Sequence, residues 1–420
     1  MHKIIKLRRK RIIAYACGLA MTLLAGNGSA DDWNQILGPN RDGIAKSLKT
    51  VEGWPNGKPT IHWRFPLGEG YAGPVVVGNQ VIVFHRVNSK ERVEAIDRET
   101  GKSMWKQDFD AYYRGGVNPD SGPRCVPLVV DDKVVVFGAA SACHAVTLHG
   151  GNRLWSRDLA EDYDAPEGYF GAGSSPIHVD GVVVLNVGGK KNESGMVGLD
   201  LDTGRTIWAS TREAASYSSP IVIEQNGAKR VFAVTRFNGI LLDPTNGKVI
   251  LTLPFGQRGP TVNAATPLFF KDRLFMTASY RIGAELHQLS NDATRKIWAN
   301  DDSLSSQYNT PIYHRSHLYG IHGREDGLPA KLRCVDADNG NVMWTKDGFG
   351  VANLLLANET MIAITGGGEI VLLNATPTKY AEKARVEFTD DNEVRALPAV
   401  DRDRLYVRDS DHLFSIQIGG

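Results

Sequence analysis

Short runs of Val, Ile, Leu and Phe recur in pairs along the chain, and each run is separated from the next by a short polar turn. Residues 73–84 (GPVVVGNQVIVF) and residues 174–187 (SSPIHVDGVVVLNV) are two such pairs. β-Branched and apolar runs bounded by Gly, Asp and Asn are typical of strands joined by hairpins. The pattern therefore predicts an all-β chain built of short antiparallel strands.

One phrase ending in tryptophan is repeated after several of these pairs: AIDRETGKSMW (95–105), GLDLDTGRTIW (198–208) and CVDADNGNVMW (334–344). In each copy, Asp can bond its own backbone two residues on, and Gly supplies the positive φ of a tight turn. Trp is a large amphipathic side chain suited to packing between neighbouring units. The repetition indicates architecture rather than a site, and we expect no Ca²⁺ at Asp336 and Asp338, because the further ligands of a calcium loop are missing.

Aligning the chain on the terminal Trp places eight positions in register, 42 to 53 residues apart: Trp63, Trp105, Trp155, Trp208, Leu251, Trp298, Trp344 and Phe388. A second set of positions marks the expected starts of the first strands: Pro74, Pro127, Pro176, Pro220, Pro267, Pro311, Asn353 and Pro398. Four-stranded units at this period predict an eight-bladed β-propeller.

Closure of the ring is expected to involve both ends of the repeat region. The last unit (396–418) supplies only three strands, and the N-terminal strand 61–67 (IHWRFPL) carries the Trp that this unit lacks. Pairing the two removes the exposed strand edges. We predict one propeller over residues 61–420, preceded by a leader over residues 31–60.

The first 30 residues have the character of a secretory signal peptide. Six basic residues and no acidic one precede an apolar run over residues 12–25, which ends before Gly28-Ser29-Ala30. This order predicts a cleaved signal and a periplasmic or other extracytoplasmic location, by the general or the twin-arginine route. Cys17 lies inside the apolar run rather than after it, so we do not expect a lipoprotein.

Charge and cysteine content narrow the possible functions. Without the six basic residues of the signal, 42 basic and 47 acidic residues leave a net charge near −5, which argues against nucleic acid as a partner. No later segment has the length and hydrophobicity of a transmembrane span. The three remaining cysteines, Cys125, Cys143 and Cys334, are an odd number and do not indicate a disulfide framework.

The repeated Trp phrase, the eightfold count and the Ser-Ser-Pro strand openings (174–176 and 218–220) resemble the pyrroloquinoline-quinone-like, or quinoprotein alcohol-dehydrogenase-like, family of eight-bladed propellers. The leader WNQILGPNRDG (33–43) is similar to that of exported bacterial members. The family contains dehydrogenases that pair pyrroloquinoline quinone (PQQ) with Ca²⁺. It also contains a non-enzymatic scaffold, the propeller lipoprotein of the outer-membrane β-barrel assembly machine.

This chain departs from the dehydrogenase pattern. The family's enzymes have two adjacent cysteines and, in quinohaemoproteins, a Cys-x-x-Cys-His phrase, and this sequence has neither. Cys125 and Cys143 are expected at the first and third strands of one blade, about 9.6 Å apart, beyond the ~7 Å Cα limit for a disulfide. We therefore expect a binding or scaffold module. The alternative is a PQQ-dependent periplasmic alcohol or sugar dehydrogenase, and a cofactor-free enzyme acting on a sugar or acid also stays open.

A binding site is expected on the face that carries the blade links and the loops between second and third strands, which are the long loops of the chain. These loops cover residues 86–92, 108–124, 159–173 and 322–331, and the second of them could plug the central funnel. Arginines follow second strands or precede first strands around the ring: Arg86, Arg236, Arg281, Arg324, Arg408, Arg124 and Arg395. Other candidate ligand-binding residues are Tyr71, Tyr217, Tyr308, Asn309, His85 and His322.

Converging arginines predict a funnel for a small anionic ligand or an envelope protein segment, and we expect a monomer. The tyrosines and Asn309 are suited to stacking on or hydrogen bonding a planar ligand. In the alternative interpretation, the arginines form ion pairs at the rim with the nearby acids Glu325, Asp326 and Asp409.

Overall fold

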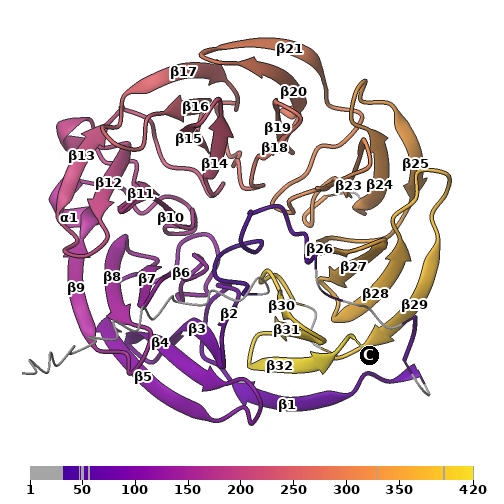
Figure 1. Ribbon diagram of the computed structural model, residues 1–420, viewed down its shortest axis with the longest axis horizontal. Helices are drawn as coiled ribbons and strands as arrows, with labels where there is room; N and C mark the ends of the chain where they lie inside the picture. The colour runs from indigo at the N-terminus through magenta and orange to yellow at the C-terminus, as the bar shows by residue number, and fades with distance from the viewer. Residues whose placement is uncertain are drawn as a thin grey trace, which may run out of the picture.

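The computed structural model describes residues 32–46, 48, 52–54, 57–327, 329–390 and 393–419. The predicted signal peptide lies outside this range. The described chain forms a ring of eight four-stranded antiparallel sheets, the blades (Figure 1). The predicted all-β, eight-bladed propeller is confirmed, and each first strand starts beside the position that the repeat alignment marks.

The first four blades take the chain from residue 75 to residue 254. Their strands are β2 Val75–Val77, β3 Gln80–Val87, β4 Lys90–Asp97 and β5 Ser103–Asp110; β6 Leu128–Val130, β7 Lys133–Phe137, β8 Ala142–Thr147 and β9 Arg153–Asp158; β10 Ile177–Val179, β11 Val182–Asn186, β12 Met196–Asp200 and β13 Thr206–Ser210; β14 Ile221–Gln225, β15 Ala228–Val234, β16 Asn238–Leu242 and β17 Val249–Pro254.

The other four blades complete the ring. Their strands are β18 Leu268–Phe270, β19 Arg273–Ala278, β20 Gly283–Ser290 and β21 Ala293–Asn300; β22 Ile312–His314, β23 His317–His322, β24 Lys331–Asp336 and β25 Val342–Lys346; β26 Ala352–Ala357, β27 Thr360–Thr365, β28 Glu369–Asn374 and β29 Glu382–Glu387; β30 Ala399–Asp401, β31 Arg404–Arg408, β32 His412–Gln417 and β1 Ile61–Pro66. β1 pairs with β32 at the outer edge of the eighth blade, so the predicted closure is confirmed.

Two predicted loops differ from the structure. Residues 86–92 are mostly strand, because β3 and β4 extend until only Asn88 and Ser89 remain between them, with Asn88 at a left-handed φ of 55°. Residues 159–173 begin with the helix α1 Leu159–Tyr163, whose first turn is capped by the Asp158 carboxylate accepting the Glu161 N–H at 3.0 Å. A 3₁₀ turn, η2 Lys191–Glu193, lies nearby in the third blade.

The repeated Trp joins each blade to the next. Trp155 donates from Nε1 to the Leu201 carbonyl at 2.9 Å, across the boundary between the second and third blades. Its ring fills the space above Gly204, where an added Cβ would lie 2.6 Å away. The same bond is made by Trp63, Trp105, Trp208, Trp298 and Trp344. Trp63, Trp105, Trp155, Trp208 and Trp298 each pack on the turn glycine of the following repeat. Trp344, whose following repeat has no glycine in this turn, packs edge-on against Tyr380.

The seventh blade breaks this rule, and the leader compensates. The strand register places Ala384, not the predicted Phe388, at the Trp position. Trp54 of the leader packs against the same hydrophobic cluster as Ala384 and donates from Nε1 to the Gln417 carbonyl at 3.2 Å in the next blade. Phe388 instead packs edge-on against Phe414. The leader thus supplies the indole that the seventh blade lacks.

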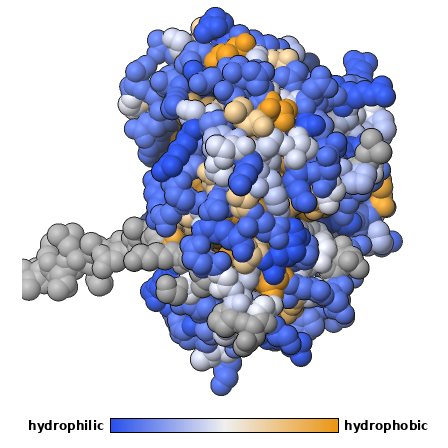
Figure 2. All heavy atoms as spheres, turned by 90° about the vertical axis from the view of Figure 1, so that its right-hand side faces the viewer, coloured by the Kyte–Doolittle hydropathy of each residue, from blue (hydrophilic) through white to orange (hydrophobic). Residues whose placement is uncertain are grey.

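The contacts between blades are apolar, and the outer surface of the ring is polar. Each hydrophobic cluster is built from the facing sides of neighbouring blades. The side view in Figure 2 is mostly hydrophilic, with small scattered apolar areas. In the described part of the chain, no helix has the length and hydrophobicity to cross a membrane.

Candidate functional site

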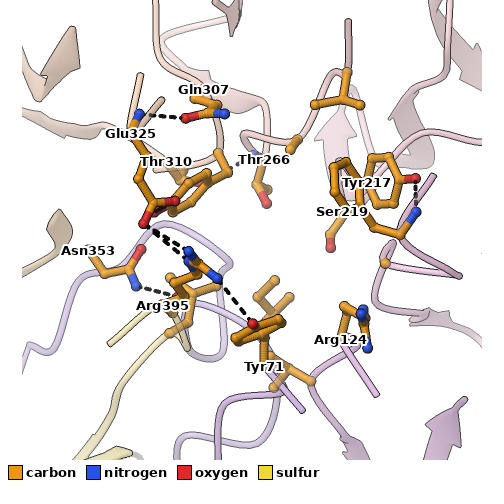
Figure 3. A pocket seen from close by; sticks show the side chains of 18 of the residues that line it. Tyr71, Arg124, Tyr217, Ser219, Thr266, Gln307, Thr310, Glu325, Asn353 and Arg395 are labelled. Carbon is orange, nitrogen blue, oxygen red and sulfur yellow. Dashed lines mark hydrogen bonds and ion pairs between the residues drawn. The ribbon is translucent and has the colours of Figure 1, made fainter. Parts of the chain in front are cut away.

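A cavity of about 390 Å³ lies on the ring axis, at the face that carries the blade links and the second-to-third-strand loops. We call it the axial cavity (Figure 3). Most of its wall comes from the residues just before the first strands, because these segments are the innermost part of each blade. Its polar and aromatic lining consists of Tyr71, Asn118, Arg124, Phe170, Tyr217, Ser219, Thr266, Tyr280, Gln307, Tyr308, Thr310, Glu325, Asp326, Asn353 and Arg395.

On one side of the axial cavity, Arg395 is held by a carboxylate from another blade. Its Nη2 lies 3.1 Å from Oε1 of Glu325, and its Nη1 donates to the Tyr71 hydroxyl at 3.0 Å (Figure 3). The Glu325 backbone N–H donates to Oε1 of Gln307 at 2.8 Å, and Gln307 in turn donates to the Tyr280 hydroxyl at 3.0 Å. Arg395 is therefore charge-compensated while it faces the cavity.

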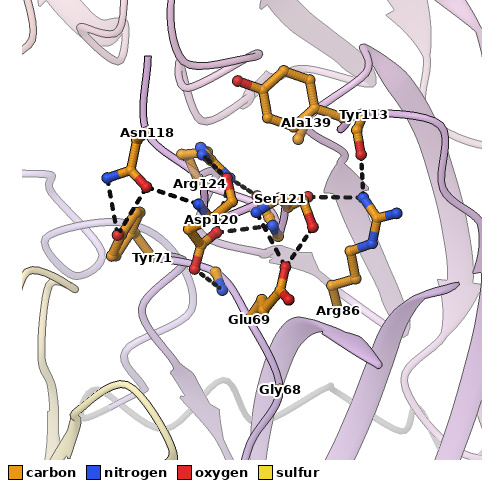
Figure 4. Close-up of polar contacts among 12 residues, drawn as sticks. Gly68, Glu69, Tyr71, Arg86, Tyr113, Asn118, Asp120, Ser121, Arg124 and Ala139 are labelled. Carbon is orange, nitrogen blue, oxygen red and sulfur yellow. Dashed lines mark hydrogen bonds and ion pairs between the residues drawn. The ribbon is translucent and has the colours of Figure 1, made fainter. Parts of the chain in front are cut away.

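On the other side of Tyr71, Arg124 belongs to the loop over residues 108–124. Its guanidinium contacts Oδ1 of Asp120 at 3.1 Å and lies 5.6 Å from the centre of the Tyr71 ring. Asp120 also accepts the Gly70 N–H at 2.9 Å, which ties the loop to the first blade (Figure 4). The loop is thus a wall of the cavity and does not plug it.

The arginines at the ends of second strands lie outside the axial cavity lining. Arg86 donates to the Ser121 carbonyl at 3.0 Å, Arg236 to the Gly259 carbonyl at 2.6 Å, and Arg408 to the Gly68 carbonyl at 2.9 Å. Each holds a blade-linking loop in place (Figure 4 shows Arg86). A guanidinium in this position satisfies loop carbonyls that have no strand partner.

Two further arginines lie at the rim. Arg324 forms an ion pair with Asp326 at 3.5 Å, and its guanidinium stacks 4.9 Å from the ring centre of Tyr280. Arg281 is exposed and makes no hydrogen bond or ion pair with another described residue. Arg324 and Arg395 therefore fit the alternative interpretation, in which arginines form ion pairs with acids at the rim, better than they fit a convergent basic funnel.

Of the other predicted ligand-binding residues, some line the axial cavity and others make structural contacts outside it. Tyr71, Tyr217 and Tyr308 line the axial cavity. Asn309 is buried behind it and donates to Oδ1 of Asn353 at 3.0 Å. His322 accepts the Ser305 N–H at 3.2 Å, and burial lowers its pKa to about 4, so it is neutral at pH 7.

His85 has the same kind of structural contact in the first blade. Its Nδ1 accepts the Gly68 N–H at 2.8 Å. Both histidines thus lie near the ends of second strands and hold loop backbone, as the arginines there do.

The floor of the axial cavity comes from the leader, which sequence reasoning did not include in the site. Ile36 lines the cavity, and Arg41, 2% exposed, donates from Nη1 to the Pro220 carbonyl at 2.7 Å and from Nη2 to the Pro176 carbonyl. The leader runs across the centre of the ring in Figure 1 and bonds the first and seventh blades at Val76 and Leu356. The only sequence signal for this role was the leader phrase itself. The axial cavity is consequently a socket with one closed end.

Glu91 holds the segment next to Gly173, which is part of the wall of the axial cavity. Its carboxylate, 2% exposed, accepts the Ala139 N–H at 2.8 Å, and the Ala139 carbonyl accepts the Ala172 N–H at 2.8 Å. Burial raises the pKa of Glu91 from 4.5 to about 7. The folded state therefore favours the protonated form of this side chain.

Glu91→Gln is expected to alter the pH dependence of stability. Between pH 4.5 and 7 the unfolded chain ionises Glu91 first, so the wild-type free energy of unfolding falls as pH rises, by at most about 3 kcal/mol, and the loss persists above pH 7. Gln keeps the acceptor for Ala139 and has no ionisation to lose. Urea unfolding from pH 4.5 to 8 should show the variant equal to wild type at the acid end and more stable at pH 8.

The matched control is Glu387→Gln, at an exposed carboxylate on β29, which should follow the wild-type profile. Parallel profiles for Glu91→Gln and wild type would contradict the assignment of a raised pKa.

The lining residues do not fit a quinone held with Ca²⁺. Within the described ranges, no group of three or more His, Cys, Asp or Glu side chains is placed to hold a metal. The acids in the wall are Glu325 and Asp326, and both are paired with arginines. Cys125 and Cys143 are free and buried. The two lining cations are likewise compensated, which leaves a nearly neutral socket rich in tyrosine and amide groups.

A family model described as "Outer membrane protein assembly factor BamB" matches residues 56–235 and 192–346. Among solved structures, BamB from Moraxella catarrhalis is similar with a TM-score of 0.63 at 14% identity, over 86% of this chain and 100% of that chain. No curated protein sequence matches the chain significantly.

Two quinohemoprotein alcohol dehydrogenases are also similar. ADHIIG from Pseudomonas putida HK5 has a TM-score of 0.68 at 11% identity, over 93% of this chain and 80% of that chain. The enzyme from Comamonas testosteroni has a TM-score of 0.54 at 14% identity, over 94% and 82% of the two chains. At these identities the structural likeness shows a common fold and nothing about chemistry.

Proposed function

Because this chain belongs to the family of outer membrane protein assembly factor BamB, we propose that it is an exported scaffold propeller that binds a segment of an envelope protein. The segment enters the axial cavity from the loop face. The predicted signal peptide supports export to the periplasm, where a partner in outer-membrane protein assembly would be met.

The observation that carries the proposal is the closed, nearly neutral socket. The leader seals one end with Ile36 and Arg41, so the cavity serves a group inserted from one side and not a passage through the ring. Tyrosines and amides line it, and its two arginines are paired with acids. Aromatic surface with a few fixed polar groups is suited to a protein side chain or loop tip.

The compensated charges favour a protein segment over a small anion, the two kinds of ligand predicted from sequence. A small anion placed beside Arg395 would also lie beside Glu325, which repels it. A partner segment brings apolar and hydrogen-bonding surface, and it gains from the tyrosines without needing a free cation.

The test is site-specific photo-crosslinking in cells of the source organism. A photoreactive phenylalanine analogue replaces Val117, 72% exposed on the loop over residues 108–124, and, as a matched control, Met343, 46% exposed on the outer strand β25. We expect Val117 to yield a crosslink to a component of outer-membrane protein assembly and Met343 to yield none. Adding Tyr71→Ala should weaken the Val117 crosslink several-fold, because it removes part of the cavity wall.

Equal crosslinking from both positions, or a Val117 crosslink untouched by Tyr71→Ala, would contradict binding at the axial cavity. The oxidoreductase alternative is tested by measuring PQQ binding. Calorimetry showing one-to-one micromolar binding of PQQ that requires Ca²⁺ would replace the scaffold with a dehydrogenase.

A further inference from the structure

A second cavity of about 260 Å³ adjoins the axial cavity between the third and fourth blades. We call it the side cavity. Gly173, Tyr217 and Val262 line both cavities, so Tyr217 forms part of the partition between them. The side cavity is otherwise bounded by glycine-rich residues 168–173 and by Asn186, Arg236 and Asn263. A segment that fills the axial cavity has this space directly beside it.

Asn186, the last residue of β11, is the unusual member of this lining. It is 2% exposed, and neither its Oδ1 nor its Nδ2 has a hydrogen-bond partner among the described residues. Asn263, 1% exposed, has a bonded Nδ2, which donates to the Thr235 carbonyl at 2.8 Å, but an unpaired Oδ1. Buried amides without partners are rare and destabilising, so each one calls for an explanation.

Comparison of the blades shows that the fold itself does not require an amide here. In the strand registers, the position of Asn186 is occupied in five other blades by apolar side chains, namely Phe84, Phe137, Val234, Ile321 and Ile364. The remaining two blades have Thr277 and Arg408. Thr277 accepts the Ser306 N–H at 3.0 Å, and Arg408 donates to the Gly68 carbonyl at 2.9 Å. Asn186 is the polar residue at this position whose side chain is unpaired.

We propose that the side cavity binds a backbone peptide group of the partner segment, through the amide of Asn186. Nδ2 donates to the peptide carbonyl and Oδ1 accepts the peptide N–H, a pairing for which an amide side chain has both required groups. This inference rests on the proposed function, since it names how the segment continues beyond the axial cavity.

Three features favour a peptide group over an anion. The unpaired Oδ1 atoms of Asn186 and Asn263 are acceptors, which repel anions. The glycines at 168, 171 and 173 leave room for backbone. Tyr169 and Phe237, 46% and 39% exposed, line the same cavity and offer apolar contact to the side chains that flank the bound peptide group.

The first test uses N-acetylglycinamide, a small diamide, as the probe. NMR of the full mature chain follows the side-chain amide signals of Asn186, assigned by their loss in Asn186→Val. We expect these signals to shift saturably with the probe. Glycerol, of similar size but without an amide, should cause no saturable shift. A saturable glycerol shift would overturn the peptide assignment in favour of a polyol, and no shift with either probe would overturn the site.

The second test separates binding from structure. Asn186→Val introduces the residue that the fourth blade has at this position, so we expect it to abolish the probe-dependent shifts of neighbouring backbone amides while raising the Tm by about 2 °C. The matched control Thr277→Val removes a bonded hydroxyl and should lower the Tm. A lower Tm for Asn186→Val would mean that an ordered water satisfies the amide, which would contradict the proposal.

The two proposals fail separately. Loss of the Val117 crosslink in the presence of probe binding at Asn186 would count against the scaffold function alone. Retained crosslinking without probe binding would count against the side cavity alone.

Discussion

Replacing Arg41 with methionine is expected to lower the free energy of unfolding by about 3 kcal/mol, because buried acceptors lose a charged donor. The stem is retained, but the Pro176 and Pro220 carbonyls lose the guanidinium that joins the leader to the third and fourth blades. Burial lowers the pKa of Arg41 to about 9, so the side chain is charged at neutral pH. The bonds that are lost are therefore charge-assisted.

The measurement combines urea unfolding with limited proteolysis of residues 33–45. Faster cleavage of the leader in Arg41→Met would show that the leader has detached from the ring. The axial cavity would then be open at both ends. The control is Arg64→Met on the exposed face of β1, which should change stability by less than about 0.5 kcal/mol. Equal protection of the leader from proteolysis in Arg41→Met and wild type would mean that Arg41 does not hold the leader in place.

Replacing Trp155 with alanine is expected to cost about 3 to 5 kcal/mol, the range for large aromatic residues removed from a core. The change deletes the hydrogen bond to Leu201 and empties the space above Gly204, where the lack of a Cβ makes room for the indole. Urea unfolding followed by circular dichroism measures the loss.

Leu251→Ala is the matched control for Trp155→Ala. Leu251 occupies the Trp position of the fourth blade but is partly exposed and has no side-chain N–H to donate. Its removal should cost about 1 kcal/mol, typical of a partly exposed side chain. Similar losses at the two positions would show that the repeated indole is not the main contact between blades.

The arginine funnel illustrates where local sequence stops being informative. Arg86 and Arg395 have the same sequence character, each beside a strand end on the loop face, yet one bonds loop carbonyls and the other faces the axial cavity. The difference depends on the Glu325 carboxylate, 70 residues from Arg395 in the chain. A partner at that distance is set by the arrangement of blades, and no local pattern encodes it.

The sequence by itself determined the number of blades, their strand order and the closing of the ring. These follow from alternation of apolar and polar residues, turn glycines and the Trp spacing, which act within one repeat or between adjacent repeats. Only the tertiary structure decided that Trp54 of the leader bonds the eighth blade, that Arg41 joins the leader to the third and fourth blades, and that Asn186 stays unpaired. Each of these depends on the space and hydrogen-bonding groups that distant segments leave free, and those exist only once the ring has closed.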